Sequence, residues 1–306
     1  MRIVYLGTPD FSVLPLKSII EAGYNVVAVG TNKDKPVGRK QVLTPTPVKN
    51  FACEKGIKVF EYDKIREEGV SDLRELNPDI IITCAFGQIL SQEILDIPRL
   101  GVINIHASLL PQLRGASPIH FAILNGLKTT GVTIMKTVYE VDAGDVLIQK
   151  SINILENETM GELFERLSVL SAEVILDALK LIESGKAVFV AQDHGKATFT
   201  KMIRKEMAKI DWNKTNEQIF NQIRAFNPSP VAFTLYKGEP LKIYSASLSN
   251  SSGKAGEILR ADNILEIACG KGSIIIEKLQ KAGSKQMIAK DFLLGNKLIV
   301  GSIIND

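Results

Sequence analysis

Two short apolar runs joined by a helical segment open the chain. Ile3–Leu6 ends at a Gly-Thr-Pro turn, and residues 11–22 have the spacing of a helix. Asn25–Val29 is the second apolar run. A strand, a helix and a strand of these lengths form parallel neighbours with a right-handed crossover. We therefore expect an N-terminal α/β domain with a doubly wound, mostly parallel, Rossmann-like sheet. The turn holds one glycine instead of Gly-x-Gly-x-x-Gly, so NAD binding is not expected.

A candidate pocket follows from where two further strands end. Ile80–Cys84 is almost wholly apolar and β-branched, which indicates a strand covered on both faces. Ligands of open parallel sheets bind beyond the carboxyl ends of the strands. The residues that follow residues 80–84 and 102–106 are therefore the candidate ligand contacts: Phe86, Gly87, Gln88, Ile89, Leu90, Ser108, Leu109, Leu110 and Pro111. For Phe86 and Leu90, ordinary core packing is an equal alternative.

The residues after Gly101 carry a set of side chains suited to acyl transfer. Val102–His106 alternates apolar and polar residues, so as a strand it places Asn104 and His106 on one face. A later strand, Gly131–Val138, leads to Asp142. An amide and an imidazole can donate to an oxygen that gains negative charge, and a carboxylate can orient the imidazole or help move a proton. No Gly-x-Ser-x-Gly elbow is present, so we expect no covalent enzyme intermediate. The alternative for His106 is a structural, half-buried histidine.

These motifs resemble a known family. The segments NIHASLLPQLRGASPI, GVTIM and VDAGD occur in the order and spacing of the folate-dependent formyltransferases. The resemblance implies that Asn104, His106 and Asp142 form the catalytic trio and that 10-formyltetrahydrofolate is the co-substrate. It also implies that the pterin lies in the pocket described above, held mainly by backbone groups. The opening GTPDF is typical of the tRNA-directed branch of the family.

Residues 32–49 interrupt the pattern with a long, basic surface loop. The loop contains several Lys and Arg residues against one acid, together with three prolines and a glycine. It is either a solvated mobile loop or an arm that contacts RNA phosphates. The tRNA-directed formyltransferases have a comparable basic insertion, which implies tRNA contacts at Lys35, Arg39 and Lys40, with Arg39 the most important.

A length of 306 residues exceeds the usual size of one domain, so we expect two. Thr159 and Glu162 have the spacing of a capping box at the start of a long helix, and Lys186–Ala191 has the pattern of a final strand. The expected boundaries are 1–189 for the catalytic domain, 190–207 for a linker and 208–306 for the second domain. The linker is basic, and Lys201, Arg204 and Lys205 are its candidate tRNA contacts, unless its charge is incidental.

The second domain has short alternating runs separated by glycine-rich turns. Six strands in about 75 residues, the last pair near Phe292 and Leu298–Val300, predict a small OB-like β-barrel. Residues 208–306 contain thirteen Lys or Arg and nine Asp or Glu, which gives +4 against +3 for the whole chain. Few aromatic residues accompany this charge, so contacts to an RNA backbone are expected to dominate. The formyltransferase resemblance includes such a barrel, although Ser229 stands where the family has tryptophan in Asn-Pro-x-Pro.

The resulting expectation is formyl transfer from 10-formyltetrahydrofolate to the α-amino group of methionyl initiator tRNA. A formyltransferase for a small amine, a hydrolase that releases formate, and an RNA-binding protein with a vestigial catalytic domain are the alternatives. Three cysteines without CxxC spacing and three unpaired histidines predict neither a disulfide framework nor a metal site. No apolar run has the length of a signal or transmembrane segment, so a cytoplasmic location is expected. A monomer is expected as well.

Overall fold

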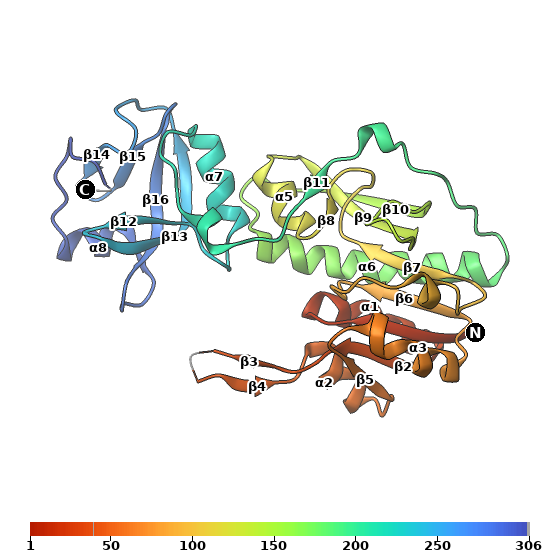
Figure 1. Cartoon of the computed structure of the whole chain (residues 1–306). Coiled ribbons are helices and arrows are strands. Elements are labelled where there is room, and N and C mark those ends of the chain that lie inside the picture. The colour runs from red at the N-terminus through yellow and green to blue at the C-terminus, as the bar shows by residue number, and fades with distance from the viewer. Residues whose placement is uncertain (39, 305–306) are drawn as a thin grey trace. The chain divides into compact units, whose positions relative to one another are not determined.

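The computed structural model describes residues 1–38 and 40–304. Arg39, a predicted tRNA contact, lies outside the described residues. The chain forms two units (Figure 1). The first consists of Met1–Pro118, Thr129–Ile152 and Phe164–Thr200, and the second of Ile119–Lys128, Asn153–Leu163 and the chain from Lys201 onward. Within the described part of the chain, no helix combines the length and apolar character needed to cross a membrane.

A seven-stranded sheet organises the first unit. Its spatial order is β10-β9-β7-β6-β1-β2-β5. The five strands from β7 to β5 are mutually parallel, and β9 joins β7 antiparallel. This confirms the predicted doubly wound, mostly parallel α/β domain. The strands are β1 (Arg2–Gly7), β2 (Asn25–Asn32), β5 (Val59–Tyr62), β6 (Ile80–Cys84), β7 (Val102–His106), β9 (Thr129–Lys136) and β10 (Val146–Asn153).

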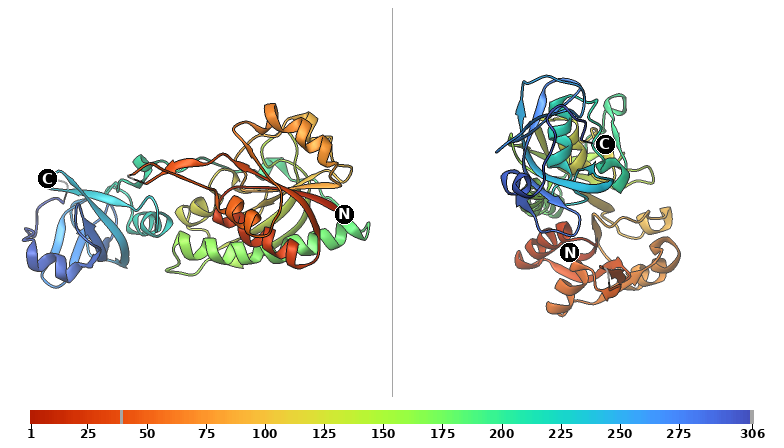
Figure 2. Two further views of the ribbon diagram at one scale, coloured as in Figure 1. Left: turned by 90° about the horizontal axis from the view of Figure 1, so that it is seen from below. Right: turned by 90° about the vertical axis from the view of Figure 1, so that its left-hand side faces the viewer.

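Helices cover both faces of this sheet (Figure 2). The face that carries Val4, Leu6 and Ile81 packs against α3 (Ile65–Leu76) and α4 (Gln92–Leu95). The short η1 (Asp10–Ser12) and α1 (Val13–Glu21) follow β1, and α1 lies beside α6 (Met160–Glu183), where Ser18 donates to the carbonyl of Ala172 at 3.2 Å.

The start of α6 is capped as predicted. The carboxylate of Glu162 accepts from the backbone N–H of Thr159 at 2.8 Å, and Thr159 Oγ1 accepts from the N–H of Glu162 at 3.3 Å. This reciprocal pair satisfies two donors that the first helical turn leaves free.

Two segments of the first unit show detail that the sequence pattern did not predict. Residues 32–49, expected to form a long surface loop or an arm, contain an antiparallel hairpin of β3 (Lys35–Val37) and β4 (Val42–Thr44), followed by α2 (Pro47–Glu54). Lys49 anchors the base of this hairpin through ion pairs with Asp34 and Glu61 at 2.7 and 2.9 Å. The predicted final strand at Lys186–Ala191 is reduced to one bridge between Val146 and Val190.

An antiparallel half-barrel organises the second unit, which agrees with the predicted class of the C-terminal domain. Its order is β12-β13-β16-β15-β14, with β17 on β16. The elements are η3 (Lys205–Ala208), α7 (Asn216–Ala225), β12 (Phe233–Tyr236), β13 (Glu239–Ser249), β14 (Ile258–Ala261), β15 (Leu265–Ala268), β16 (Ser273–Lys281), β17 (Met287–Ile288) and α8 (Ala289–Gly295).

The predicted last pair of strands was also wrong. Phe292 lies in helix α8, and Leu298–Val300 forms no strand. Ala289, Phe292 and Leu293 are buried at spacings of three and four residues, which is the period of one helix face. In so short an apolar segment the pattern of a strand and that of a helix are hard to tell apart.

Candidate active site

The predicted imidazole and carboxylate meet at the carboxyl end of β7. Nδ1 of His106 lies 3.5 Å from Oδ2 of Asp142, and both side chains are largely buried. The same carboxylate oxygen accepts a hydrogen bond from the backbone N–H of Gly115 at 2.7 Å. Asp142 has a φ of 50°, in the left-handed region that few non-glycine residues occupy. Residues 36 positions apart in sequence are therefore brought into contact by the antiparallel pairing of β9 with β7.

The second ring nitrogen of His106 is also occupied. Nε2 lies 3.0 Å from the carbonyl oxygen of Leu113. A carbonyl oxygen can only accept, so Nε2 carries a proton in this arrangement. Nδ1 then faces Oδ2 of Asp142, and the bond to Leu113 holds the ring in this orientation. For His106 to donate to a substrate oxygen, the contact with Leu113 has to open.

Asn104 lies two residues before His106 on β7, and its amide is oriented by the neighbouring strand. Asn104 pairs with Thr83 in the parallel register of β6 and β7, and Thr83 Oγ1 donates to Asn104 Oδ1 at 2.7 Å. Among the described residues, the amide nitrogen of Asn104 donates to no protein acceptor. Both of its N–H groups are thus available to a ligand. Thr83 was not predicted, although it is the one polar residue within residues 80–83.

Cys84, which follows Thr83 on β6, is fully buried. Burial raises the pKa of its thiol to about 12. A thiol with so high a pKa is a poor nucleophile, since the thiolate is the reactive form.

The candidate ligand residues after β6 divide into anchors and free groups. Phe86 and Leu90 are buried in the core on the α3 face, so their side chains are core residues. Gln88 is fully engaged, because its amide donates to Asn32 and to the carbonyl of Tyr62 and accepts from the N–H of Ile65. Ile89 is 57% exposed, and a side chain at Gly87 would meet no atom within 4 Å. A rigid loop therefore presents its backbone to open space at residues 87–89.

The candidate residues after β7 are tied to β9 and β10. Ser108 is fully buried and donates to the carbonyl of Gln112. Thr133 accepts from the N–H of Leu110 at 3.2 Å, and Gln149 donates to the carbonyl of Leu110 at 2.7 Å. Leu109 and Pro111 are half-buried, and the peptide bond between Leu110 and Pro111 is cis. This loop is thus held by side chains of two other strands.

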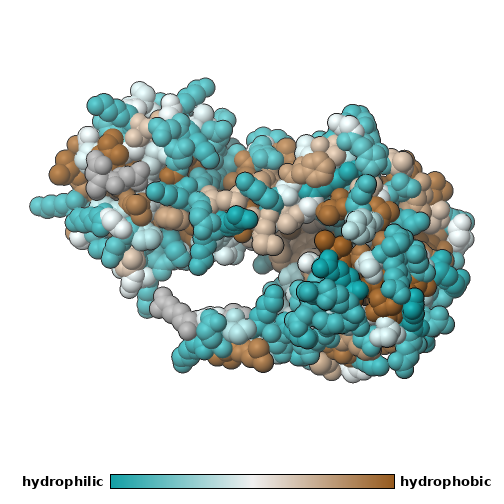
Figure 3. Space-filling view, in the orientation of Figure 1, coloured by the Kyte–Doolittle hydropathy of each residue, from teal (hydrophilic) through white to brown (hydrophobic). Residues whose placement is uncertain are grey.

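The predicted tRNA contacts that are described are exposed cations. Lys35 and Lys40 lie on the β3–β4 hairpin of the first unit, and Lys201, Arg204 and Lys205 lie in the second. Within residues 1–38 and 40–304 none of the five forms an ion pair with a carboxylate. The hairpin also exposes Val42 and Leu43, which appear as an apolar patch on an otherwise hydrophilic arm (Figure 3).

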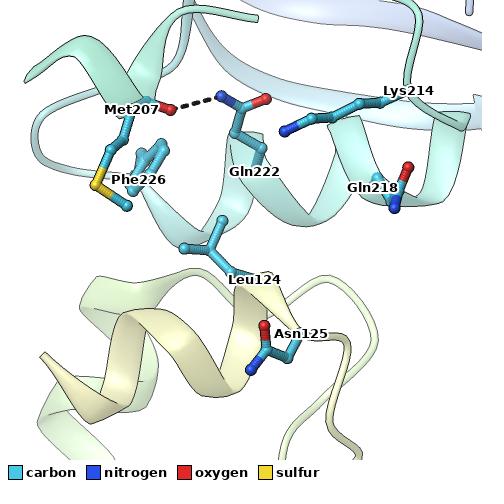
Figure 4. A pocket seen from close by; sticks show the side chains of 7 residues that line it. All are labelled: Leu124, Asn125, Met207, Lys214, Gln218, Gln222 and Phe226. Carbon is cyan, nitrogen blue, oxygen red and sulfur yellow. Dashed lines mark hydrogen bonds between the residues drawn. The ribbon is translucent and has the colours of Figure 1, made fainter. Parts of the chain in front are cut away.

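The second unit contains a cavity of its own, of about 250 Å³ (Figure 4). No predicted site residue lines it. Gln222 donates to the carbonyls of Met207 and Lys209 there, at 2.8 and 3.0 Å. The lining residues are Leu124, Asn125, Met207, Lys214, Gln218, Gln222 and Phe226.

Residues 1–179 match the family described as Formyl transferase, and residues 202–297 match that described as Formyl transferase, C-terminal domain. The fold and the site thus belong to a formyl transferase. The chain is 45% identical to the methionyl-tRNA formyltransferase of Bacillus cytotoxicus over 98% of both chains. It is 44% identical to that of Enterococcus faecalis over 96% of both. The chain therefore belongs to the methionyl-tRNA formyltransferase family, which confirms the resemblance noted in the sequence.

Solved structures support the same fold. The sugar 3N-formyl transferase WlaRD, determined in the presence of dTDP and 5-N-formyl-THF, has a TM-score of 0.70 at 23% identity, with 93% of this chain and 99% of that chain covered. HypX from Aquifex aeolicus, in complex with tetrahydrofolic acid, has a TM-score of 0.62 at 19% identity. That match covers 96% of this chain, which spans about half the length of HypX (47%).

Proposed function

We propose that the chain transfers the formyl group of 10-formyltetrahydrofolate to the α-amino group of methionyl initiator tRNA, as a step of translation initiation. The observation that carries this proposal is the 45% identity to a methionyl-tRNA formyltransferase along 98% of both chains. The contact between His106 and Asp142 and the free amide of Asn104 support it, because they supply the groups that such a transfer needs.

The proposed roles follow from the hydrogen bonds of the site. 10-Formyltetrahydrofolate supplies the formyl carbon, and attack by the amine places negative charge on the formyl oxygen. Collapse of this intermediate breaks the bond to N10, and N10 takes up a proton as tetrahydrofolate leaves. Asn104 donates to that oxygen, while Thr83 keeps the amide oxygen turned away. Asp142 orients His106 and assists removal of the amine proton, directly or through water. His106 joins Asn104 as an oxyanion donor once Nε2 leaves the carbonyl of Leu113.

The residues after β6 offer fixed backbone groups for the pterin that the family resemblance implies. The loop is immobilised by the side chains of Phe86, Gln88 and Leu90, whereas the backbone at Gly87 borders open space. Fixed donors and acceptors lose little entropy when a ligand binds. We propose residues 86–90 and 108–111 as the pterin site on this basis.

For the tRNA, we propose phosphate contacts at Lys35 and Lys40 on the hairpin, at Lys201, Arg204 and Lys205, and at Arg39, which lies outside the described residues. Exposed cations without carboxylate partners keep their full charge for a polyanion. Residues 1–189 would perform the transfer, with 190–207 and 208–306 contributing to tRNA binding. A cytoplasmic monomer remains part of the proposal.

The test is a formylation assay with labelled 10-formyltetrahydrofolate and the full chain. The acceptors are methionyl initiator tRNA, the uncharged tRNA, glycinamide ribonucleotide and an amino sugar nucleotide, and one reaction contains no acceptor. Label that appears only on methionyl-tRNA supports the proposal. Preferred transfer to a small amine, or release of formate without an acceptor, would identify one of the alternative enzymes. Tight tRNA binding without any transfer would indicate a vestigial site.

A further inference from the structure

Gln192 forms a buried bridge between two parts of the active site that are distant in sequence. Gln192 is 7% exposed, and its side chain makes four hydrogen bonds to nitrogen and oxygen atoms as well as a 4.0 Å contact with Sδ of Met135. Oε1 accepts from Nε and Nη2 of Arg114 at 3.1 and 2.7 Å. Nε2 donates to the carbonyls of Asp142 and Gly144 at 2.9 and 2.7 Å. The amide oxygen thus binds the segment of Arg114, and the amide nitrogen binds the loop of Asp142.

The bonds through Gln192 close a ring around Asp142. Arg114 binds Gln192, Gln192 binds the backbone of Asp142, and the carboxylate of Asp142 binds the backbone N–H of Gly115, the residue after Arg114. Asp142 is therefore held at its backbone and at its side chain. A buried network in which every member is satisfied is rigid, because loosening one bond leaves another group unpaired.

The loop of Asp142 needs such support. Asp142 has a φ of 50°, which is unfavourable for a residue with a side chain. Gly144 lies so close to β9 that an added Cβ would collide with the carbonyl of Lys136. Two donors from one amide hold the carbonyls on either side of this tight turn.

Arg114 orients Gln192 in turn. Its side chain is 4% exposed, and besides Gln192 it contacts Nδ1 of His194 at 3.2 Å. Two guanidinium N–H groups on Oε1 leave only one orientation of the amide, with Nε2 toward Asp142. The segment around it is fixed as well, since Thr198 pairs with Leu113 and Arg114 through 2.8 Å hydrogen bonds. This part of the predicted linker therefore belongs to the first unit.

We propose that Gln192, oriented by Arg114, is a positioning residue that sets the carboxylate of Asp142 against His106 for formyl transfer. The inference rests on the proposed function, because it assigns Gln192 a role in that reaction. It acts through Asp142 and makes no contact with substrate.

The first test is Gln192→Glu. The new carboxylate still accepts both N–H groups of Arg114, but when ionised it cannot donate to the carbonyls of Asp142 and Gly144. We expect kcat to fall roughly 10- to 100-fold, with the KM for each substrate unchanged, because the lost bonds position a catalytic group. Gln192→Met, which lacks both the donor and the acceptor, is the second variant, and its kcat is expected to fall at least as far.

A matched control is Gln222→Glu in the second unit. Gln222 is also buried, at 4% exposed, and also donates to two backbone carbonyls, those of Met207 and Lys209. The substitution therefore removes two hydrogen bonds of the same kind, but none of them involves Asp142. Its thermal stability is expected to fall as in Gln192→Glu, with kcat retained.

The decisive measurement is the double variant Gln192→Glu with Asp142→Asn. If Gln192 acts only through Asp142, the double variant is no slower than Asp142→Asn alone. Additive losses, or a Gln192→Glu variant as fast as the parent, would overturn the inference. Failure of the unmodified chain to formylate any acceptor would instead overturn the proposed function.

Discussion

Oδ2 of Asp142 receives the backbone N–H of Gly115 at 2.7 Å and lies 3.5 Å from Nδ1 of His106. One carboxylate oxygen thus serves a structural bond and the proposed catalytic contact at once. The two functions can be separated by substitution, because an amide oxygen still accepts from Gly115 but carries no charge toward His106.

Asp142→Asn is expected to fold normally and to lose activity. An amide preserves the bond to Gly115, while general-base assistance and the electrostatic orientation of His106 disappear. Such assistance typically contributes about 10²- to 10⁴-fold, so kcat is expected to fall by at least about 100-fold. Single-turnover formylation and a thermal unfolding curve measure the two effects. Turnover near that of the parent would remove Asp142 from the mechanism.

Asn104→Ala removes the proposed oxyanion donor. Loss of one such donor typically lowers kcat by about 10²- to 10³-fold. Thr83→Val is a graded companion: it keeps the amide but frees it to rotate, since Thr83 fixes Oδ1. A smaller loss, of about 3- to 10-fold, is expected there, with recovery in Thr83→Ser. If Thr83→Val lowered kcat as much as Asn104→Ala does, Thr83 would have a role beyond orienting the amide of Asn104.

Leu90→Ala and Ile89→Ala separate the core from the ligand side of the loop after β6. Leu90 is 5% exposed and Ile89 is 57% exposed. Truncating a buried leucine costs about 2–5 kcal/mol, whereas an exposed position changes the free energy of unfolding by less than about 0.5 kcal/mol. Chemical denaturation tests this, and the KM for the formyl donor is expected to rise only in Ile89→Ala. Equal destabilisation by the two substitutions would contradict this division.

Lys35→Ala and Lys40→Ala test the hairpin as a phosphate-binding arm. Each is expected to raise the KM for methionyl-tRNA without changing kcat, and to reduce the slope of log affinity against log salt by about one. Lys17→Ala on α1 is the control, because Lys17 is an exposed lysine that pairs with Glu21 instead. If the salt dependence of tRNA affinity did not change, the two lysines would not contact phosphates.

The three cysteines are expected to differ sharply in reactivity. Cys53 is exposed, whereas Cys84 and Cys269 are buried and burial raises the pKa of each of these thiols to about 12. At pH 8 only about one in 10⁴ of the buried thiols would be ionised, and the thiolate is the reactive form. Titration with a disulfide reagent is expected to show one fast thiol in the folded chain and three in denaturant. A second fast thiol without unfolding would contradict the burial of Cys84 or of Cys269.

Much of the fold and the proposed catalytic trio could be predicted from contiguous residues. The apolar run at residues 80–84 and the alternation at 102–106 contain the information for β6 and β7, because side-chain periodicity is a local property. The capping pair of Thr159 and Glu162 is likewise local. The three predicted strands that failed, at 186–191, around Phe292 and at 298–300, are short segments in which periodicity carries little information.

The support of the site was decided by the tertiary structure alone. Thr83 reaches Asn104 across 21 residues, and Arg114 reaches Gln192 across 78. No period or motif links such pairs, since their contact depends on which strands become neighbours and on where the chain folds back. The sequence by itself therefore determined which residues could perform the chemistry, whereas the packed structure determined which others hold them in place.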